Sequence, residues 1–274
     1  MVALIFIQYN QFMKIGFFDS GLGGLTILKA VAKYLPDYDY VFYGDTANLP
    51  YGDKSEEEIY ELTRKGIEYL FQADCLLVII ACNTASAETA RRLQTEFLPE
   101  NYGDRKILGV IVPTIEILQF EKTTKVALLA TKRTIESKKY HKELGLKGNG
   151  NVVLIDVATP ELVPKIELGQ IELASQEAIR RIEAEAGESE TVVLGCTHYT
   201  EIKTPLREHF KDSKKIISQD EVIPEKLSWY LDAHSEIKDK LSRGGQRVVH
   251  LTEHKPYFDR VLQQLLGGVM VDEN

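Results

Sequence analysis

Two cysteines in this chain occupy matched positions that could support thiol chemistry. Cys82 follows the apolar run at 76–80, and Cys196 follows a similar run at 191–195, each with a threonine within two residues. A thiol can act as a nucleophile, as an acid and base, or as a metal ligand. A single cysteine at a strand end often only fills space in the core. The repetition of the pattern favours a chemical role for both residues.

A glycine-rich turn follows the first predicted strand. Asp19 and Ser20 precede the glycines at 21–24, and the segment then opens a helix. A dinucleotide-binding fingerprint is disfavoured, because Thr26 stands where that motif needs a third Gly or Ala. In one interpretation the backbone amides approach a small anion while Asp19 points into a cleft. In the other, the turn is purely structural and Asp19 caps the helix.

Three further segments have both a chemical and an ordinary interpretation. His198, two residues after Cys196, could share a proton with a substrate or a thiol, or could be a core histidine or a helix cap. Glu167 is typical of a solvated acid at a helix end. The segment 48–52 contains Pro-x-Gly and is typical of a connecting turn.

Composition excludes several functional classes. The chain has 274 residues and a net charge of −8, without a Lys/Arg-rich run, so neither nucleic acid nor an anionic membrane is indicated as a partner. Its three cysteines are too few for a disulfide framework, which favours a reducing cytoplasm. Residues 1–7 are apolar but lack the features of a signal peptide and are too short to span a bilayer.

Strand signals alternate with helix-length segments from Met13 onward, which predicts an α/β fold with parallel sheets and right-handed crossovers. A capping box, Ser55-x-x-Glu58, marks the start of one helix, and a helix-compatible run covers 85–97. The predicted strands are 14–18, 39–43, 76–80, 106–111, 125–130, 152–157, 191–195, 215–218 and 247–252.

A weak internal echo accompanies this alternation. The strand at 14–18 leads into Asp19, and the strand at 125–130 leads into Thr131. The Cys82 strand is echoed in turn by the Cys196 strand. We therefore expect two α/β halves of similar plan that face each other, each contributing one cysteine.

With these residues assembled, the chain resembles the glutamate racemases of the aspartate/glutamate racemase superfamily. The resemblance runs from Met13 to about Gly267 and comprises motifs in a fixed order. They are Ile15-Gly16-Phe17-Phe18-Asp19-Ser20-Gly21-Leu22-Gly23-Gly24, Gly44-Asp45-Thr46, Pro50-Tyr51-Gly52, Ala81-Cys82-Asn83-Thr84-Ala85, Ala130-Thr131-x-x-Thr134 and Leu194-Gly195-Cys196-Thr197-His198-Tyr199.

The resemblance implies a cofactor-independent racemase, without a metal, that makes D-glutamate for peptidoglycan. Cys82 and Cys196 would be the two catalytic bases, supported by Asp19 near the first and by Glu167 and His198 near the second. Glutamate would be the small-molecule substrate, and we expect a homodimer. The residues that would hold the substrate are Asp19, Ser20, Tyr51, Gly52, Asn83, Thr84, Thr131, Thr134, Thr197 and His198.

The resemblance also implies two α/β domains with the active site in the cleft between them. The first domain would comprise 13–112 plus 221–274, and 113–220 would be an inserted second domain. Residues 1–12 would be an N-terminal extension. The chain departs from the family pattern at Val112-Pro113-Thr114, at Thr159-Pro160 and at Ser218-Gln219-Asp220. These departures leave substrate choice and oligomer geometry open.

The proposed chemistry explains why two thiols are needed. An amino-acid Cα–H is a very weak acid, and racemisation removes a proton from one face while another is added to the opposite face. One thiol and one thiolate must therefore be present together. Both cysteines precede predicted helices, whose N-termini favour a thiolate. Two alternatives stay open: a metal site formed by Cys82, Cys196 and His198, and an aspartate, hydantoin or other racemase of the same superfamily.

Overall fold

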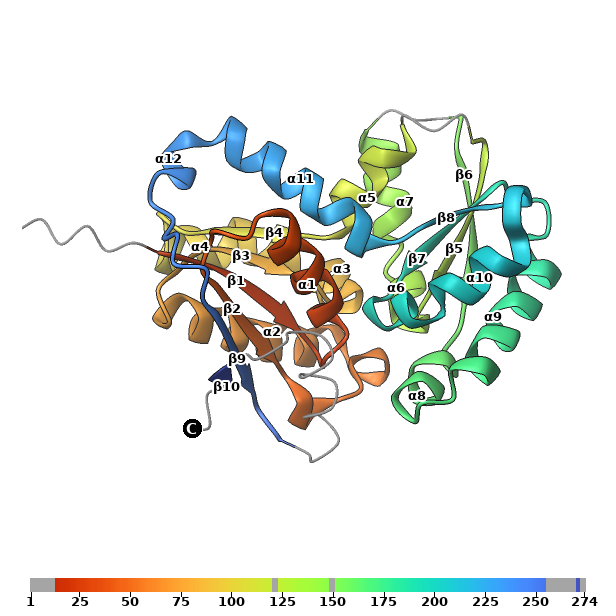
Figure 1. Cartoon of the computed structure of the whole chain (residues 1–274), viewed down its shortest axis with the longest axis horizontal. Helices are drawn as coiled ribbons and strands as arrows, with labels where there is room; N and C mark the ends of the chain where they lie inside the picture. Colours follow the sequence, from red (N-terminus) through yellow and green to blue (C-terminus); the bar gives the residue numbers. More distant parts are fainter. Residues whose placement is uncertain (1–12, 120–122, 148–150, 255–269, 272–274) are drawn as a thin grey trace, which may run out of the picture.

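The first sheet contains strands from both ends of the chain. The computed structural model describes residues 13–119, 123–147, 151–254 and 270–271. Six parallel strands run in the order β10-β9-β2-β1-β3-β4 (Figure 1). They are β1 (Lys14–Asp19), β2 (Tyr40–Gly44), β3 (Cys75–Ile80), β4 (Lys106–Gly109), β9 (Arg247–Leu251) and β10 (Met270–Val271). The short strand β10 was not predicted.

The second sheet repeats the plan of the first. Its parallel strands are β5 (Lys125–Ala130), β6 (Val153–Ala158), β7 (Thr191–Gly195) and β8 (Lys215–Ile217), in the order β6-β5-β7-β8. This is the order β2-β1-β3-β4 of the first sheet, with β5 in the place of β1 and β7 in the place of β3. The predicted fold, two similar α/β halves with parallel sheets, is confirmed.

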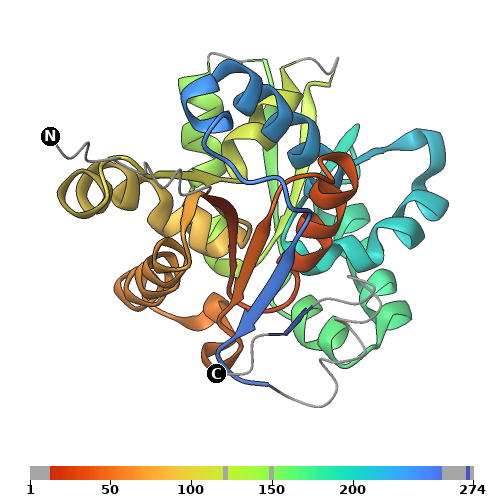
Figure 2. The same ribbon diagram turned by 60° about the vertical axis from the view of Figure 1, so that its left-hand side comes forward.

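Helices cover both faces of each sheet, which explains why the strands are continuous apolar runs. On the first sheet, α1 (Gly24–Tyr34) and α11 (Gln219–Ala233) pack on one face, and α2 (Glu56–Gln72) and α3 (Asn83–Arg92) on the other (Figure 2). On the second sheet, α5 (Ile111–Leu118) and α7 (Lys139–Leu146) lie opposite α8 (Leu162–Glu167), α9 (Ile171–Ala186) and α10 (Lys203–Phe210). The shorter helices are α4 (Leu98–Asn101), α6 (Lys132–Glu136) and α12 (Ser235–Lys238).

The local signals at helix starts are largely confirmed. Ser55 and Glu58 form the predicted reciprocal capping box at the start of α2. The helix predicted for 85–97 begins at Asn83, and after Arg92 it continues as a π-helical turn, η3 (Leu93–Phe97), into α4. The strand predicted for 106–111 ends at Gly109. A Cβ on Gly109 would lie 2.3 Å from Ser86 Oγ, so α3 packs closely against the sheet there.

The four strands of the second sheet lie, in sequence, between β4 and β9 of the first. The chain leaves the first sheet through α5 and returns through α11, and these two helices lie side by side (Figures 1 and 2). The predicted domain boundaries, after 112 and after 220, fall within the first turns of these helices. The predicted extension at 1–12 lies outside the described residues. Among the helices that are described, none has the length and apolar character needed to span a membrane.

Candidate active site

The predicted site residues come from the carboxyl ends of strands that face one another. Asp19 ends β1, Cys82 follows β3, and Cys196 follows β7. In each half the strand order reverses at the first strand, β1 or β5, because later strands lie on both sides of it. Ligands bind at such switch points in α/β sheets. The two halves touch there, since Thr197 Oγ1 donates a hydrogen bond of 3.3 Å to Asp19 Oδ2.

Cys82 is buried, and the carboxylate of Asp19 lies close enough to affect it electrostatically. It is the N-cap of α3, where its Sγ accepts from the backbone N–H of Ala85 at 3.4 Å and from Ser20 Oγ at 3.3 Å. Burial raises the pKa of the Cys82 thiol to about 12, and the negative charge of Asp19 adds to the shift. The two hydrogen bonds oppose this rise and are outweighed. At this cysteine, burial therefore outweighs the effect of the helix N-terminus, which favours a thiolate.

Asp19 is fully buried. The sequence allowed either a structural role in the glycine-rich turn or a position facing the cleft, and its two carboxylate oxygens divide these between them. Its Oδ1 accepts from the backbone N–H of Gly21 at 2.8 Å, so it orders the glycine-rich turn, and its Oδ2 faces Thr197 across the cleft. Burial raises the pKa of Asp19, although the charge of His198 and the hydrogen bonds lower it. The neutral form of this carboxyl group is therefore more favoured in the folded protein than it is in water.

The Cys196 site contains an imidazole and a second carboxylate. Cys196 precedes a 3₁₀ helix, η4 (Thr197–Ile202), rather than the predicted α-helix, and its side chain makes no cap bond. Its Sγ lies 3.9 Å from His198 Nδ1, and His198 Nε2 lies 3.2 Å from Glu167 Oε1 at the end of α8. Burial disfavours the charged imidazole, but the contacts with Cys196 and Glu167 raise the pKa of His198 well above its usual value.

A cluster of threonine hydroxyls joins the two halves on another side of the cleft. Thr84 of α3 lies 3.0 Å from the hydroxyl of Thr131 and 3.3 Å from that of Thr134. Thr131 is the N-cap of α6 and accepts from the backbone N–H of Thr134. The three hydroxyls face the same space and can both donate and accept hydrogen bonds, so they can bind a carboxylate.

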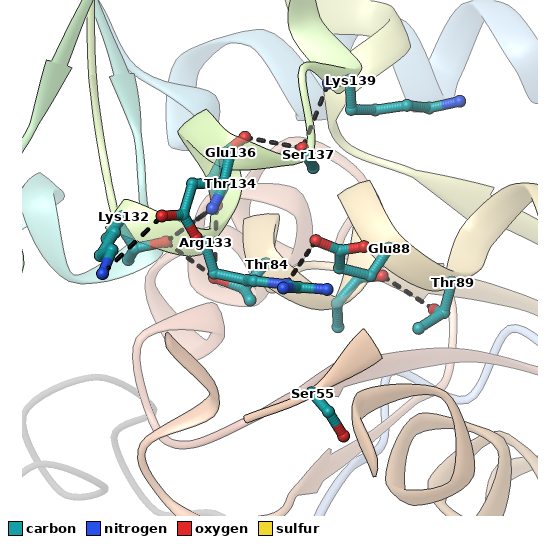
Figure 3. A network of polar contacts seen from close by, with 12 residues as sticks. Ser55, Thr84, Glu88, Thr89, Lys132, Arg133, Thr134, Glu136, Ser137 and Lys139 are labelled. Carbon is teal, nitrogen blue, oxygen red and sulfur yellow. Dashed lines mark hydrogen bonds and ion pairs between the residues drawn. The ribbon is translucent and has the colours of Figure 1, made fainter. Parts of the chain in front are cut away.

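An ion pair lies beside this cluster and also spans the two halves. Glu88 of α3 and Arg133 of α6 approach to 2.7 Å, with Thr84 and Thr134 next to them (Figure 3). Glu88 is almost fully buried, and its burial raises the pKa of the carboxyl group while Arg133 opposes the shift. Sequence reasoning did not single out this pair, because each residue reads as an ordinary surface charge on its helix.

Tyr51 is fixed by a buried acid, whereas Gly52 leaves room. Tyr51 Oη donates to Asp45 Oδ2 at 2.7 Å, and Asp45 Oδ1 accepts from Asn48 and Thr252. A Cβ on Gly52 would meet nothing within 4 Å, so the backbone is open to an incoming group there. Both residues belong to η2 (Tyr51–Asp53), which packs against α6 of the opposite half.

Asn83 is held by two residues, Gln219 and Tyr140, that sequence reasoning did not place in the site. Its carboxamide exchanges two hydrogen bonds with Gln219 and accepts one from Tyr140, and Gln219 also donates to Thr114. All four side chains are buried. The available signal was Gln219 itself, a departure from the family pattern at the end of β8. Tyr140 looks like any core tyrosine on a helix.

The halves approach closely at Gly23, before α1. A Cβ there would lie 2.4 Å from Thr197 Oγ1 and 3.0 Å from His198 Nδ1, so any side chain would push the Cys196 loop away. The glycine at this position is required by the close contact.

The metal interpretation required Cys82, Cys196 and His198 to converge with a further ligand. Across residues 13–119, 123–147 and 151–254, no group of three or more His, Cys, Asp or Glu side chains has an arrangement that could hold a metal ion.

Comparison with known proteins places the chain in a family. Residues 25–219 match the family described as Asp/Glu/Hydantoin racemase. The glutamate racemase of Jannaschia sp. (strain CCS1) is 37% identical over 244 residues, which cover 82% of this chain and 87% of the relative.

Solved structures agree with this match. The glutamate racemase of Bacillus anthracis has a TM-score of 0.82 at 27% identity, covering 96% of this chain and 97% of that one. The glutamate racemase of Francisella tularensis, solved in complex with D-glutamate, has a TM-score of 0.80 at 26% identity, with the same coverage. This chain belongs to the Asp/Glu/Hydantoin racemase family and, within it, to the glutamate racemases, which are isomerases that act on amino acids.

Proposed function

We propose that this protein interconverts L- and D-glutamate without a cofactor, using Cys82 and Cys196 as acid and base on opposite faces of the substrate. One observation carries the proposal. The two cysteines follow equivalent strands of two sheets that share a four-strand order, both are buried, and the two halves touch between Asp19 and Thr197. A planar carbanion formed between the two sulfurs could be protonated on the face opposite the one that lost its proton, which inverts the configuration.

The names of the relatives and the ligand bound in one of them support glutamate as the substrate. The Jannaschia and Bacillus anthracis proteins are named glutamate racemases, and the Francisella tularensis structure contains D-glutamate. The hydroxyls of Thr84, Thr131 and Thr134, together with Ser20 and the Tyr51-Gly52 turn, supply donors for two carboxylates. None of these donors carries a positive charge.

The different surroundings of the two cysteines supply the thiol and the thiolate that one turnover needs. Cys82 starts as a thiol, because burial raises its pKa to about 12. His198 is held protonated beside Cys196 by Glu167 and by the sulfur itself, and an adjacent cation stabilises a thiolate. We therefore assign to Cys196 the removal of the Cα proton from one enantiomer, while Cys82 donates to the other face.

Turnover leaves the proton positions reversed, and they must be restored. The imidazolium of His198 must first release a proton, to Glu167 or to water, and the neutral ring can then take the proton from Cys196, whose sulfur is 3.9 Å from Nδ1. Asp19 has a raised pKa and lies within electrostatic range of Cys82, so it can exchange a proton with that thiol or with the substrate amino group. Thr197 links Asp19 to the Cys196 loop.

The wider setting follows from this activity. We assign 13–112 plus 221–274 to one domain and 113–220 to the other, with the cleft between them, and we expect a homodimer. D-glutamate is a building block of peptidoglycan, which gives the product its use. Since the mechanism needs free thiols, a reducing compartment suits it, and we place the reaction in the cytoplasm.

Circular dichroism tests the proposal directly. Purified protein incubated with L-glutamate, without any added cofactor, should reduce the optical signal to zero as the two enantiomers reach equal concentrations. L-aspartate under the same conditions should keep its signal far longer. A stable L-glutamate signal would refute the proposal, and faster loss with aspartate would move the activity to another branch of the family.

A further inference from the structure

A buried set of hydrogen bonds at the junction of the two halves fixes the carboxamide of Asn83. Asn83 Nδ2 donates to Gln219 Oε1 at 2.7 Å, and Asn83 Oδ1 accepts from Gln219 Nε2 at 2.8 Å and from Tyr140 Oη at 2.8 Å. Gln219 Nε2 also faces Tyr140 Oη at 3.2 Å and Thr114 Oγ1 at 3.3 Å. Exposure of each side chain is 2% or less, so water does not compete for these bonds.

The direction of these bonds is set by a backbone carbonyl. Thr114 Oγ1 donates its single hydrogen to the carbonyl oxygen of Val110 at 2.7 Å, and a carbonyl can only accept. Thr114 is left as an acceptor toward Gln219, so the amide nitrogen of Gln219 must face Thr114 and its oxygen must face Asn83 Nδ2. The orientation of both carboxamides then follows without any choice.

Tyr140 completes the arrangement. One N–H of Gln219 goes to Asn83 Oδ1, and Tyr140 Oη shares the other with Thr114 Oγ1, while the Tyr140 hydroxyl gives its own hydrogen to Asn83 Oδ1. Burial raises the pKa of Tyr140, and the nearby Cys196 adds to the shift, so the hydroxyl keeps the proton that it donates. Both lone-pair directions of Asn83 Oδ1 are thereby occupied.

One hydrogen-bonding function of Asn83 remains. Its side chain has one further N–H on Nδ2, and within the described part of the chain no residue accepts it. An N–H can bind a carboxylate oxygen but cannot accept from an ammonium group. A free asparagine carboxamide could do either.

We propose that Gln219, anchored by Thr114, is a positioning and specificity residue that turns Asn83 into a pure hydrogen-bond donor for a carboxylate of the substrate. This proposal rests on the racemase function proposed above. Gln219 is the first residue of α11, just after β8, which pairs with the β7 strand that precedes Cys196, and Asn83 follows Cys82 directly. The amide pair therefore links the Cys82 loop to the start of α11, and the substrate's ammonium group must bind on another side of the cleft.

Gln219→Leu tests the proposal, since it keeps the approximate volume and removes both amide functions. We expect the KM for L- and D-glutamate to rise by about 10-fold, as for the loss of one hydrogen bond to a charged group, while kcat changes less than about 3-fold. Gln94→Leu is the matched control. Gln94 likewise uses Nε2 as a hydrogen-bond donor, to the backbone carbonyl of Ile107 at 2.8 Å, but it lies away from the cleft.

A double-mutant cycle separates positioning from general stability. If Gln219 acts through Asn83, then adding Gln219→Leu to Asn83→Ala should change KM by less than about 2-fold. Independent effects on KM would overturn the proposal, as would a similar rise in KM in Gln94→Leu. Thr114→Val gives a second variant if Gln219→Leu does not fold. It should raise KM by about 3-fold, and an unchanged KM would show that the amide orientation does not depend on Thr114.

These outcomes are distinct from a failure of the racemase function. Wild-type protein that does not racemise glutamate refutes the function. An active wild type with an unaffected Gln219→Leu variant refutes only the role of Gln219.

Discussion

The loops that carry Cys82 and Cys196 end equivalent strands, yet their electrostatic surroundings are opposite. Cys82 lies against the carboxylate of Asp19, and burial with that charge raises its pKa to about 12. Cys196 lies 3.9 Å from His198, whose pKa is raised by Cys196 and Glu167. Of the two cysteines, only Cys82 accepts a hydrogen bond from a helix N-terminus.

This difference shows that the repeated scaffold sets position but not protonation. Strand order brings the two sulfurs to facing loops, while non-repeated neighbours decide which sulfur holds a proton. It also shows that burial outweighs a helix N-terminus, because Cys82 has the better cap and still has a raised pKa. A symmetric reaction is therefore served by an asymmetric resting site.

Removal of either sulfur has the largest expected effect. Cys82→Ser and Cys196→Ser should each abolish racemisation in both directions, by at least about three orders of magnitude, because every turnover uses both groups and a serine hydroxyl is a poor base. The assay is circular dichroism of either enantiomer. Cys75→Ser is the control, since Cys75 is a buried cysteine in β3 that the mechanism does not use.

Isotope incorporation tests the same pair of groups without a mutation. In deuterated water, the first D-glutamate formed from L-glutamate should carry deuterium at Cα, while the remaining L-glutamate stays protiated. Early deuterium in the recovered L-glutamate would indicate a single base that serves both faces. Substantial activity in either serine variant would contradict the mechanism as well.

His198→Asn and Asp19→Asn should reveal which cysteine each residue supports. We expect each change to lower kcat/KM by about 10²–10⁴-fold, the usual contribution of an acid–base group. Because enantiomers have equal free energies in water, kcat/KM must fall equally in both directions. The asymmetry should instead appear in the kinetic isotope effect with α-deuterated substrate.

The expected isotope effects are mirror images. In His198→Asn the effect should increase for the enantiomer whose proton Cys196 removes and decrease for the other. In Asp19→Asn the two enantiomers should exchange these responses. The same response in both variants would show that the two residues do not serve separate cysteines.

Most of the fold could be predicted because its signals are local. Buried parallel strands are uninterrupted apolar runs, and nine of them were placed to within about two residues. The repeat of Asp19 and Thr131, and of Cys82 and Cys196, correctly indicated two halves of one plan. The errors at 106–111 and 85–97 arose where helix packing, as at Gly109, decided the boundary.

The missing parts of the candidate site are those that depend on contacts between distant segments. Gln219 meets Asn83 across 136 positions, and Glu88 meets Arg133 from the opposite half. Glu88 and Arg133 are ordinary charges in their own segments, and the departure from the family pattern at Gln219 does not by itself indicate a contact with Asn83. The sequence did not indicate which cysteine holds the proton either, because burial is a property of the assembled halves and not of the strand end.

Glu167→Gln should have a modest effect that depends on pH. The carboxylate helps to raise the pKa of His198, so its removal should lower that pKa, and the imidazole should lose its proton at lower pH. The basic limb of the kcat/KM profile should then move to lower pH. At neutral pH the loss should be less than about 5-fold, since Glu167 is partly exposed and such pairs contribute little. An unchanged basic limb would show that Glu167 does not affect the protonation of His198 at the Cys196 site.

The smallest expected effect concerns stability on the Cys82 side. Asp19 has a raised pKa in the folded protein, so the stability that its neutral form contributes is present below its unfolded value of 3.8 and is lost as pH rises through the folded pKa. Asp19→Asn removes this titration. The melting temperature of the variant minus that of the wild type should therefore become more positive between pH 4 and pH 8. Each kcal/mol of unfolding free energy corresponds to about 2–4 °C. Asp39→Asn, at a buried acid that accepts two backbone N–H groups elsewhere, is the control and should lower stability. If the relative melting temperature of Asp19→Asn falls with pH instead, the hydrogen bonds from Gly21 and Thr197, which favour the charged carboxylate, outweigh burial. Asp19 would then be charged in the folded protein, as His198 is beside Cys196.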